Sequence, residues 1–356
     1  KDNLGREVGD YRNNGITDTL PISGRDLLTT LDLELQQYGE KLMQNKIGGI
    51  VALDIETGGI LSMVSTPTYD PNQLTINRNR GEDYKKLLKD PNKIFFNRAT
   101  MAEYPPGSLF KPFVALVALQ EEATTVDRTI TCNYGYYYNG IVRPACHGHP
   151  TCRNVSMAIQ HSCNAYFAQL FRDIVDRKTH YKEPEEGLNV FEKYMRLFGL
   201  GETLDIDFPQ EKPGNIPTTV YYDKLYGKNR WFSPYIMSVG IGQGETLMTN
   251  MQMANLAAAI ANKGSYYTPH LVQYFREGQD TLNAIGTFRE LNYTGIDTVH
   301  FQPVIDGMEM VVRAGTARSA YTPDITICGK TGTAENPHGE DHSIFFAFAP
   351  KENPEI

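Results

Sequence analysis

The sequence predicts an α+β domain whose central antiparallel sheet is built from both chain ends around a helical subdomain. Two strand-like apolar runs near the N-terminus, at 48–54 and 59–65, flank a turn signal typical of a hairpin. Two more strand-like runs lie near the C-terminus, at 326–332 and 344–349. Segments with apolar residues at helical spacing lie between the two pairs, and this segregation of strands and helices indicates the fold class.

The composition is that of an ordinary globular protein. The chain has 356 residues, of which 40% are hydrophobic and 21% charged, so it can bury one large core or two smaller ones. Its net charge of −8 disfavours a broad phosphate-binding surface, and we expect no nucleic-acid partner. No apolar run reaches the roughly 18–20 residues that a membrane-spanning helix needs.

The expected elements follow one another along the chain. Residues 1–22 are polar and rich in glycine, so we expect a linker or the remnant of an adjoining domain there, followed by a single domain over 23–356. A first helix is expected at 32–45, and a mostly irregular stretch with one short charged helix at 67–98. Apolar periodicity predicts further helices at 108–121, within 151–175, and at 190–200, 250–262 and 303–314.

The C-terminal run 344–349 is followed by a turn signal at 350–354, just before the sequence stops. A turn in this position usually leads to a partner strand. We therefore expect the domain to continue beyond this chain.

A serine and a lysine stand one helical turn apart at the start of the predicted helix 108–121. On a helix, residues i and i+3 share a face, so the hydroxyl of Ser108 and the amine of Lys111 should lie together. A desolvated lysine favours its neutral form, which can accept the proton of a serine nucleophile. The pattern S-x-x-K alone also occurs by chance and carries little weight.

Two further motifs follow in order: Ser162-Cys163-Asn164, and Lys330-Thr331-Gly332-Thr333 on a predicted strand. With the first motif they form the S-x-x-K, S-x-N and K-T-G set of serine acyl-transferring enzymes that react with penicillin. Three elements in this order and in these structural contexts are much more specific than any one of them.

Each motif has a role that acyl transfer requires. Ser108 is expected to be the nucleophile, Lys111 its base, and Ser162 the group that passes a proton to the leaving amine, with Lys330 polarising that hydroxyl. Asn164 is expected to hold the amide of an incoming peptide. Thr331, Gly332 and Thr333 should form the substrate-binding strand edge, and the backbone N–H groups of Ser108 and Thr333 the oxyanion hole.

With these motifs in place, the sequence resembles the transpeptidase domain of class B penicillin-binding proteins, most of all the elongation-type enzyme of the rod-shape machinery. The resemblance also rests on residues 24–27, 35–36, 49–54, 240–245 and 342–343. It implies the fold shared by penicillin-binding transpeptidases and serine β-lactamases, with one more C-terminal strand and a helix that this chain lacks. It further implies an extracytoplasmic location, on the periplasmic face of the inner membrane, with an N-terminal anchor helix outside this chain.

The resemblance also implies an activity and its partners. The activity is D,D-transpeptidation: Ser108 attacks the D-Ala-D-Ala end of a peptidoglycan stem peptide, releases D-alanine, and the acyl-enzyme is resolved by the amine of a neighbouring stem. β-Lactam antibiotics would acylate the same serine, and a membrane glycan polymerase of the elongation machinery is the implied partner.

Two alternatives on the same fold stay open. In the first, the protein is a β-lactam-binding sensor in which Ser108 is acylated without turnover. In the second, it is a serine β-lactamase, because Glu185-Glu186-Gly187-Leu188-Asn189 matches the Glu-x-x-Leu-Asn element of class A enzymes. We interpret that match as coincidental and the glutamates as a solvated cluster.

Cysteine and histidine gather around the second motif. Four of the five cysteines and three histidines lie between 132 and 163, a density that suits a tetrahedral zinc site. The expected structural zinc ligands are Cys132, Cys146, His149 and Cys163, with Cys152 and His147 in reserve. A Cys146–Cys152 disulfide or free thiols are the alternatives.

Two further motifs are expected to have structural roles. The glycine-rich stretch 240–245 is not flanked by the strand and helix of a dinucleotide-binding unit, so we expect a closely packed loop that walls the cleft. The tyrosine-rich run 134–138 is expected to be a hairpin that packs.

Overall fold

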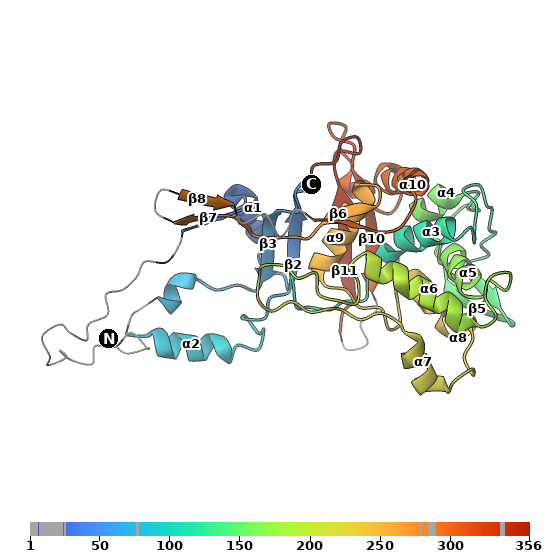
Figure 1. Ribbon diagram of the computed structural model, residues 1–356, viewed down its shortest axis with the longest axis horizontal. Helices are drawn as coiled ribbons and strands as arrows, with labels where there is room; N and C mark the ends of the chain where they lie inside the picture. Colours follow the sequence, from blue (N-terminus) through green and yellow to red (C-terminus); the bar gives the residue numbers. More distant parts are fainter. Residues whose placement is uncertain are drawn as a thin grey trace, which may run out of the picture.

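The computed structural model describes residues 6, 24, 26–75, 78–277, 280–283, 290–334 and 339–356. Within this part of the chain, helices and strands are segregated as expected for an α+β protein (Figure 1). The expected linker at 1–22 lies outside the described residues, apart from Arg6. Among the described residues, none of the helices combines the length and hydrophobicity that crossing a bilayer requires.

The helices match most of the expected segments. They are α1 (Leu33–Leu42), α2 (Arg80–Leu88), α3 (Lys111–Gln120), α4 (Val155–Gln160), α5 (Asn164–Val175), α6 (Pro184–Leu197), α7 (Thr219–Tyr226), α8 (Ser233–Ile236), α9 (Asn250–Ala261) and α10 (Phe301–Ala314). Short 3-10 turns precede or link them, among them η2 (Gly107–Phe110) and η3 (Met237–Ile241).

The strands pair as antiparallel ladders. They are β1 (Asp26–Thr29), β2 (Gly48–Leu53), β3 (Ile60–Thr66), β4 (Gly135–Tyr138), β5 (Ile141–Ala145), β6 (Ser265–Tyr267), β7 (Val272–Glu277), β8 (Asp280–Asn283), β9 (Leu291–Tyr293), β10 (Cys328–Ala334) and β11 (His342–Phe348). In the part of the chain that the structure describes, four ladders have two strands each: β2 with β3, β10 with β11, β4 with β5, and β6 with β9. The fifth has three strands in the order β1-β7-β8.

Strands from the two chain ends lie near each other, but they do not join into the single central sheet that the sequence analysis expects, because a cavity separates β2 from β11. The β2–β3 and β10–β11 pairs stand side by side in Figure 1, and β2 and β11 line the two sides of a cavity of about 520 Å³. At one end of this cavity Glu355 O accepts from Ile55 N at 3.0 Å, and Ile356 O accepts from Ala349 N at 2.9 Å. The sheet is therefore present as two facing ladders.

Helices α3, α4, α5, α6 and α10 pack together and form what we term the helical lobe, with α3 at its centre. Every residue of α3 from Lys111 to Leu119 is buried, which explains why this helix is almost wholly apolar. Its N-terminal Phe113 packs edge-on against Phe191 of α6, with ring centroids 5.3 Å apart. Burying each such side chain contributes roughly 1.5–3 kcal/mol, so α3 is a rigid base for the residues at its N-terminus.

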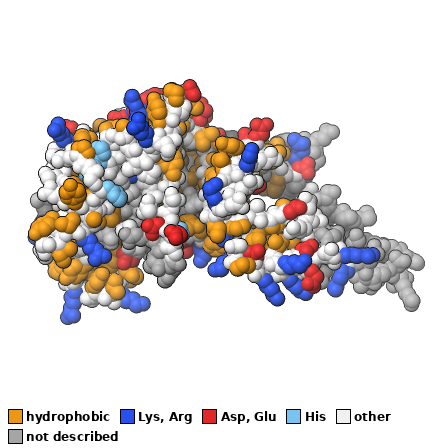
Figure 2. Space-filling view, turned by 180° about the vertical axis from the view of Figure 1, so that it is seen from behind, with side chains coloured by type: hydrophobic (Ala, Val, Ile, Leu, Met, Phe, Trp, Pro, Cys, Tyr) orange, Lys and Arg blue, Asp and Glu red, His pale blue; other side chains and the backbone are white. Residues whose placement is uncertain are grey.

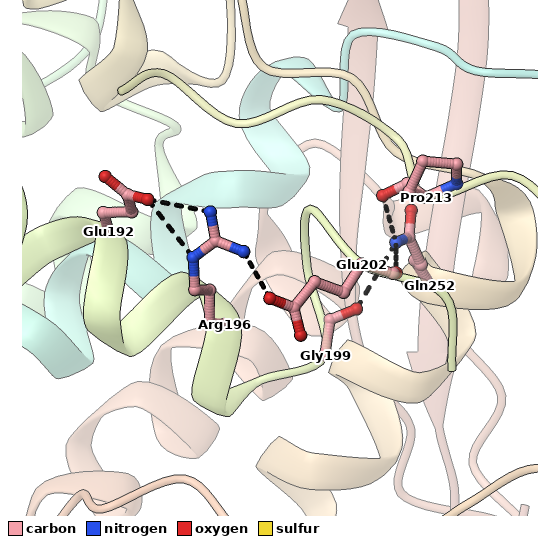
Figure 3. A network of polar contacts seen from close by, with 6 residues as sticks. All are labelled: Glu192, Arg196, Gly199, Glu202, Pro213 and Gln252. Atoms are coloured by element: carbon pink, nitrogen blue, oxygen red, sulfur yellow. Dashed lines mark hydrogen bonds and ion pairs between the residues drawn. The ribbon is translucent and has the colours of Figure 1, made fainter. Parts of the chain in front are cut away.

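Polar contacts fix the loop that follows α6 (Figure 3). Gln252 of α9 is fully buried, and its Nε2 donates to the carbonyl oxygens of Gly199 at 3.3 Å, Glu202 at 3.0 Å and Pro213 at 2.8 Å. On the same loop Glu202 pairs with Arg196 of α6. Because one buried amide serves three carbonyls, the loop is held against α9 without secondary structure of its own.

Two expected helices differ from the structure in detail. The segment 151–175 forms α4 and α5, because Ser162 adopts a left-handed φ of 53° between them and ends the first helix. The helix expected at 190–200 starts earlier, with Pro184 in its first turn, and ends before Gly199, whose φ is 76°.

Candidate active site

The first motif forms a tight turn against the last one. Gly107 has a φ of 53°, and its N–H donates to Gly242 O at 2.8 Å. A Cβ at Gly107 would lie 2.6 Å from Thr333 O, so only glycine allows β10 to pass this close. Ser108 follows in η2 and is half-buried, whereas Lys111, at the start of α3, is fully buried.

The two lysines of the motifs converge on Ser162. Lys111 Nζ donates to Ser162 Oγ at 3.1 Å and to Ser162 O at 2.6 Å. Lys330 Nζ donates to the same hydroxyl at 3.0 Å and to Thr331 O at 3.0 Å. The three sequence motifs are thus brought into one site. Within the described residues, no hydrogen bond joins the Ser108 hydroxyl to Lys111, whose amine is engaged with the second motif.

Burial sets the electrostatics of both lysines. Desolvation lowers the pKa of Lys111 to about 8, although the nearby thiols of Cys163, Cys146 and Cys152 oppose the shift. The pKa of Lys330 lies well below its usual value, first because of burial and second because the Lys111 ammonium is close. Two buried amines at this spacing cannot both carry a proton without cost, so a neutral amine is available to accept one.

Asn164 braces the site from the second motif. Its Oδ1 accepts from Lys111 Nζ at 2.6 Å, while its Nδ2 donates to Ala145 O at 2.6 Å, at the end of β5. Cys163 caps α5, because its Sγ accepts from Tyr166 N at 3.3 Å. The left-handed Ser162, the capping Cys163 and the bridging Asn164 therefore form one rigid turn.

The K-T-G strand closes the other side. Gly332 of β10 is buried, and a Cβ there would lie 2.7 Å from Pro106 O, so the strand and the Ser108 turn are in backbone contact. Thr333 is exposed at the same edge. Thr331 Oγ1 lies 2.6 Å from Thr316 Oγ1. The sequence analysis missed Thr316, because it follows α10 and belongs to no motif.

The predicted cysteine and histidine cluster is assembled in the structure. The candidate ligand atoms of Cys132, Cys146, His149 and Cys163 all lie within 4.8 Å of one another. All five cysteines are free thiols, so the Cys146–Cys152 disulfide considered above does not form. Cys328, the first residue of β10, is buried and does not belong to this group of four.

One nitrogen atom of this cluster, on the imidazole ring of His149, is buried and lacks a hydrogen-bond partner. His149 Nδ1 lies 2.7 Å from Pro150 O, and since a carbonyl only accepts, Nδ1 carries the proton. His149 Nε2 is then a bare lone pair, and it is buried without a hydrogen-bond partner. Hydrogen bonding to Cys163 and burial raise the pKa of Cys146, which keeps that thiol protonated when no cation is present. Soft thiols and an unpartnered imidazole nitrogen fit zinc.

The glycine-rich loop agrees with the sequence analysis, and the tyrosine-rich run forms the expected hairpin but packs only in part, since Tyr134 and Tyr137 are exposed. Gly242 packs so closely that a Cβ would lie 2.1 Å from Gly107 O, which makes its loop a wall of the site. The tyrosine-rich run forms β4, paired with β5. Glu185 lies on α6, where its Oε1 accepts from Asn229 N at 3.2 Å, and it contacts none of the three motifs.

Comparison with known proteins shows the family. A family model described as the penicillin binding protein transpeptidase domain matches residues 48–356. The chain is 32% identical over 358 residues to the peptidoglycan D,D-transpeptidase MrdA of Escherichia coli K12, covering 94% of this chain and 54% of that protein. It therefore spans about half the length of the curated relatives it matches.

Solved structures of two similar proteins share the fold. The imipenem acyl-enzyme complex of penicillin-binding protein A from M. tuberculosis is 28% identical, with a TM-score of 0.73 over 93% of this chain and 73% of that one. A peptidoglycan synthase complex, described as coordinating polymerization and crosslinking, contains a chain that is 29% identical, with a TM-score of 0.75 over 93% of this chain and 57% of that one.

Proposed function

This chain belongs to the penicillin-binding protein transpeptidase family, and from that premise we propose that it is a peptidoglycan D,D-transpeptidase acting through a Ser108 acyl-enzyme. The observation that carries the proposal is the convergence of Lys111 and Lys330 on the Ser162 hydroxyl, beside the Ser108 turn. A serine nucleophile, a buried amine and a proton-relaying hydroxyl are the groups that acyl transfer to an amine requires.

In the acylation step, Ser108 Oγ attacks the carbonyl carbon between the two D-alanines of a stem peptide. Neutral Lys111 accepts the hydroxyl proton, and the backbone N–H groups of Ser108 and Thr333 stabilise the tetrahedral oxyanion. The C–N bond then breaks, and the leaving D-alanine nitrogen receives a proton through Ser162, which lies 3.1 Å from Lys111 Nζ. The products are a serine ester and free D-alanine.

In the second step, the amine of a neighbouring stem peptide attacks the ester carbonyl. Its proton returns along the same relay to Ser108 Oγ as the ester bond breaks, and an amide cross-link is the product. Lys330, 3.0 Å from Ser162 Oγ, keeps that hydroxyl oriented. Thr331, Gly332 and Thr333 offer the edge of β10 to the peptide backbone.

Asn164 has a more specific role here than the sequence alone suggests. Both ends of its side-chain amide are engaged, one by Lys111 and one by Ala145 O. We therefore assign it first to positioning Lys111. Holding a substrate amide would require it to exchange one of these contacts.

We propose that Cys132, Cys146, His149 and Cys163 hold a structural zinc. Acyl transfer itself needs no metal, and four protein ligands leave no open position on one. When bound, zinc would keep these thiols deprotonated and cross-link their segments. Because Cys163 lies between Ser162 and Asn164, the cluster would brace the turn that positions both side chains.

The proposed partners follow from the same chemistry. β-Lactams should acylate Ser108, as imipenem acylates the related M. tuberculosis protein. New stem peptides arrive on nascent glycan, so we propose a membrane glycan polymerase as partner, in line with the related synthase complex. The site of action is then the periplasmic face of the inner membrane.

Fluorescent penicillin tests the proposed nucleophile. The unaltered chain should form one covalent adduct, mapped to Ser108 by intact mass and peptide digestion, and Ser108→Ala should form none. Ser319→Ala, an exposed serine outside the motifs, is the matched control and should label normally. Equal labelling of Ser108→Ala would refute the assignment.

A second assay separates the enzyme from the two alternatives. In a coupled assay with a glycan polymerase, a transpeptidase releases D-alanine and forms cross-links. Labelling without D-alanine release would identify a sensor. Rapid hydrolysis of the penicillin adduct would identify a β-lactamase.

A further inference from the structure

The end of the helical lobe that carries α7 exposes an unusual group of aromatic and aliphatic side chains. Each is between 39% and 77% exposed, and together we term them the aromatic platform: Val220, Tyr221, Leu225, Tyr226, Phe232 and Tyr235. Figure 1 shows α7 projecting from the body of the molecule beside α8. Figure 2 shows hydrophobic and basic side chains gathered at the corresponding end. Exposed apolar groups at this density usually mark a binding surface.

Buried aromatic side chains support the aromatic platform. Tyr222 and Trp231 are buried beneath it, with ring centroids 5.5 Å apart, and Trp231 Nε1 donates to Asp223 Oδ1 at 2.8 Å. On the surface, Tyr235 lies 5.6 Å from Tyr226, measured between ring centroids. The exposed rings therefore sit on a packed base, which limits the conformational entropy they would lose when a ligand binds.

Basic side chains interleave with these rings. Lys224, Lys228 and Arg230 are all exposed, whereas the nearest acidic side chain in the sequence, Asp223, is engaged by Trp231. Glu185 also reaches this segment, where its Oε1 accepts from Asn229 N at 3.2 Å, but the three basic side chains stay exposed beside it. Flat apolar rings among cations suit a ligand that presents sugar faces and carboxylates together.

The platform is joined to the active site through one loop. Tyr222 OH donates to Glu245 Oε2 at 2.6 Å, which fastens α7 to the loop that begins at Gly242. Gly242 O accepts from Gly107 N at 2.8 Å, immediately before Ser108. Two hydrogen bonds therefore connect α7, through the loop 242–245, to the turn that holds the nucleophile.

We propose that the aromatic platform binds the glycan strand of peptidoglycan and so presents its stem peptides to Ser108. This proposal rests on the proposed function. Sugar rings stack their C–H faces on the exposed tyrosines, and stem-peptide carboxylates pair with Lys224, Lys228 and Arg230. The site takes an anionic glycopeptide, because such a ligand presents sugar faces to the rings and carboxylates to the basic side chains.

Co-sedimentation with insoluble peptidoglycan sacculi tests the platform. Two variants of the whole chain are compared with the unaltered protein, Tyr221→Ala/Tyr235→Ala and Lys224→Glu/Arg230→Glu. Each should bind sacculi about tenfold more weakly or worse, the size expected when two anchoring side chains are removed. The charge variant should also show a weaker dependence on salt. The matched control Tyr293→Ala/Lys86→Glu removes an exposed tyrosine and an exposed lysine elsewhere and should bind normally.

Labelling with soluble fluorescent penicillin is measured in parallel, because it reports on Ser108 and on folding without the platform. All variants should label at the unaltered rate. Sacculus binding that is equal in every variant, or absent from the unaltered chain, overturns the proposal. Variants that keep sacculus binding but lose cross-linking only when a polymerase is present would overturn it in favour of a protein-binding surface. Platform-dependent sedimentation without penicillin labelling would support the platform and refute the catalytic assignment instead.

Discussion

At the scale of single residues, the site depends on groups that water cannot reach. Lys111 and Lys330 are both fully buried, and each has hydrogen-bond acceptors fixed by the backbone or by Ser162. The chemistry proposed above uses the neutral amine of Lys111, so its protonation should be visible in kinetics.

The first prediction concerns pH. Burial lowers the pKa of Lys111 to about 8, so below that pH the amine holds its proton and cannot accept another from Ser108. The rate of acylation by fluorescent penicillin should fall about tenfold per pH unit well below 8 and level off above it. Initial labelling rates across this range give the profile. A rate that does not change from the acid to the alkaline side of 8 would contradict the assignment of Lys111 as base.

The second prediction concerns Asn164. Asn164→Ala removes an acceptor from the buried Lys111 amine and a donor from Ala145 O, and an unsatisfied buried group costs about 1–3 kcal/mol. We expect penicillin acylation to slow roughly tenfold to a hundredfold. Asn262→Ala, which removes a similar contact to Ile55 O away from the site, is the control. An unchanged acylation rate in Asn164→Ala would show that the contact of Asn164 with Lys111 is not needed for acylation.

At the scale of elements, the turn between α4 and α5 carries both catalytic and cysteine side chains. Ser162 is left-handed there, Cys163 caps α5, and Cys146 Sγ accepts from Ala165 N at 3.2 Å. The end of β5 and the start of α5 are therefore fastened together by the same residues that form the cluster.

The third prediction concerns metal removal. Protein purified without chelator should contain about one zinc per chain, and a chelator should expose three reactive thiols and slow acylation, because the turn loses its cross-link. Zinc affinity should fall as pH falls, since its thiol ligands must lose protons. Cys163→Ser should lose the metal, whereas Cys328→Ser, a buried thiol outside the cluster, should keep it. If the protein purified without chelator contains no zinc and its cluster thiols are already reactive, the proposed zinc site is refuted.

The elements also show what the sequence reveals and what it does not. The three motifs and the four cluster residues were predicted because each depends on residue type and short spacing. Helices α7 and α8 were not predicted, since their tyrosines give no clear apolar periodicity. Thr316 was missed because only tertiary packing brings it to Thr331. The split of 151–175 depends on the φ of Ser162, which no propensity indicates.

At the scale of the whole molecule, the site lies where the helical lobe meets the strands. Its parts come from the start of α3, the α4–α5 turn and β10, so neither lobe contains it alone. The buried α3 and the ladder of β10 with β11 each hold one lysine in place. Folding of both is therefore required before Ser162 can contact the two amines together.

The facing edges of β2 and β11 have a consequence for hydrogen exchange. Amide groups of these strands that point into the cavity between them have no neighbouring strand to bond to along most of its length, whereas those turned toward β3 or β10 are laddered. In deuterated buffer, the first set should exchange far sooner than the second within the same two strands. Peptide-resolved mass spectrometry would then show fast exchange for the cavity-facing amides of β2 and β11, and slow exchange for the amides of the same strands that bond to β3 or β10. A uniformly slow middle would mean that the cavity is closed to solvent.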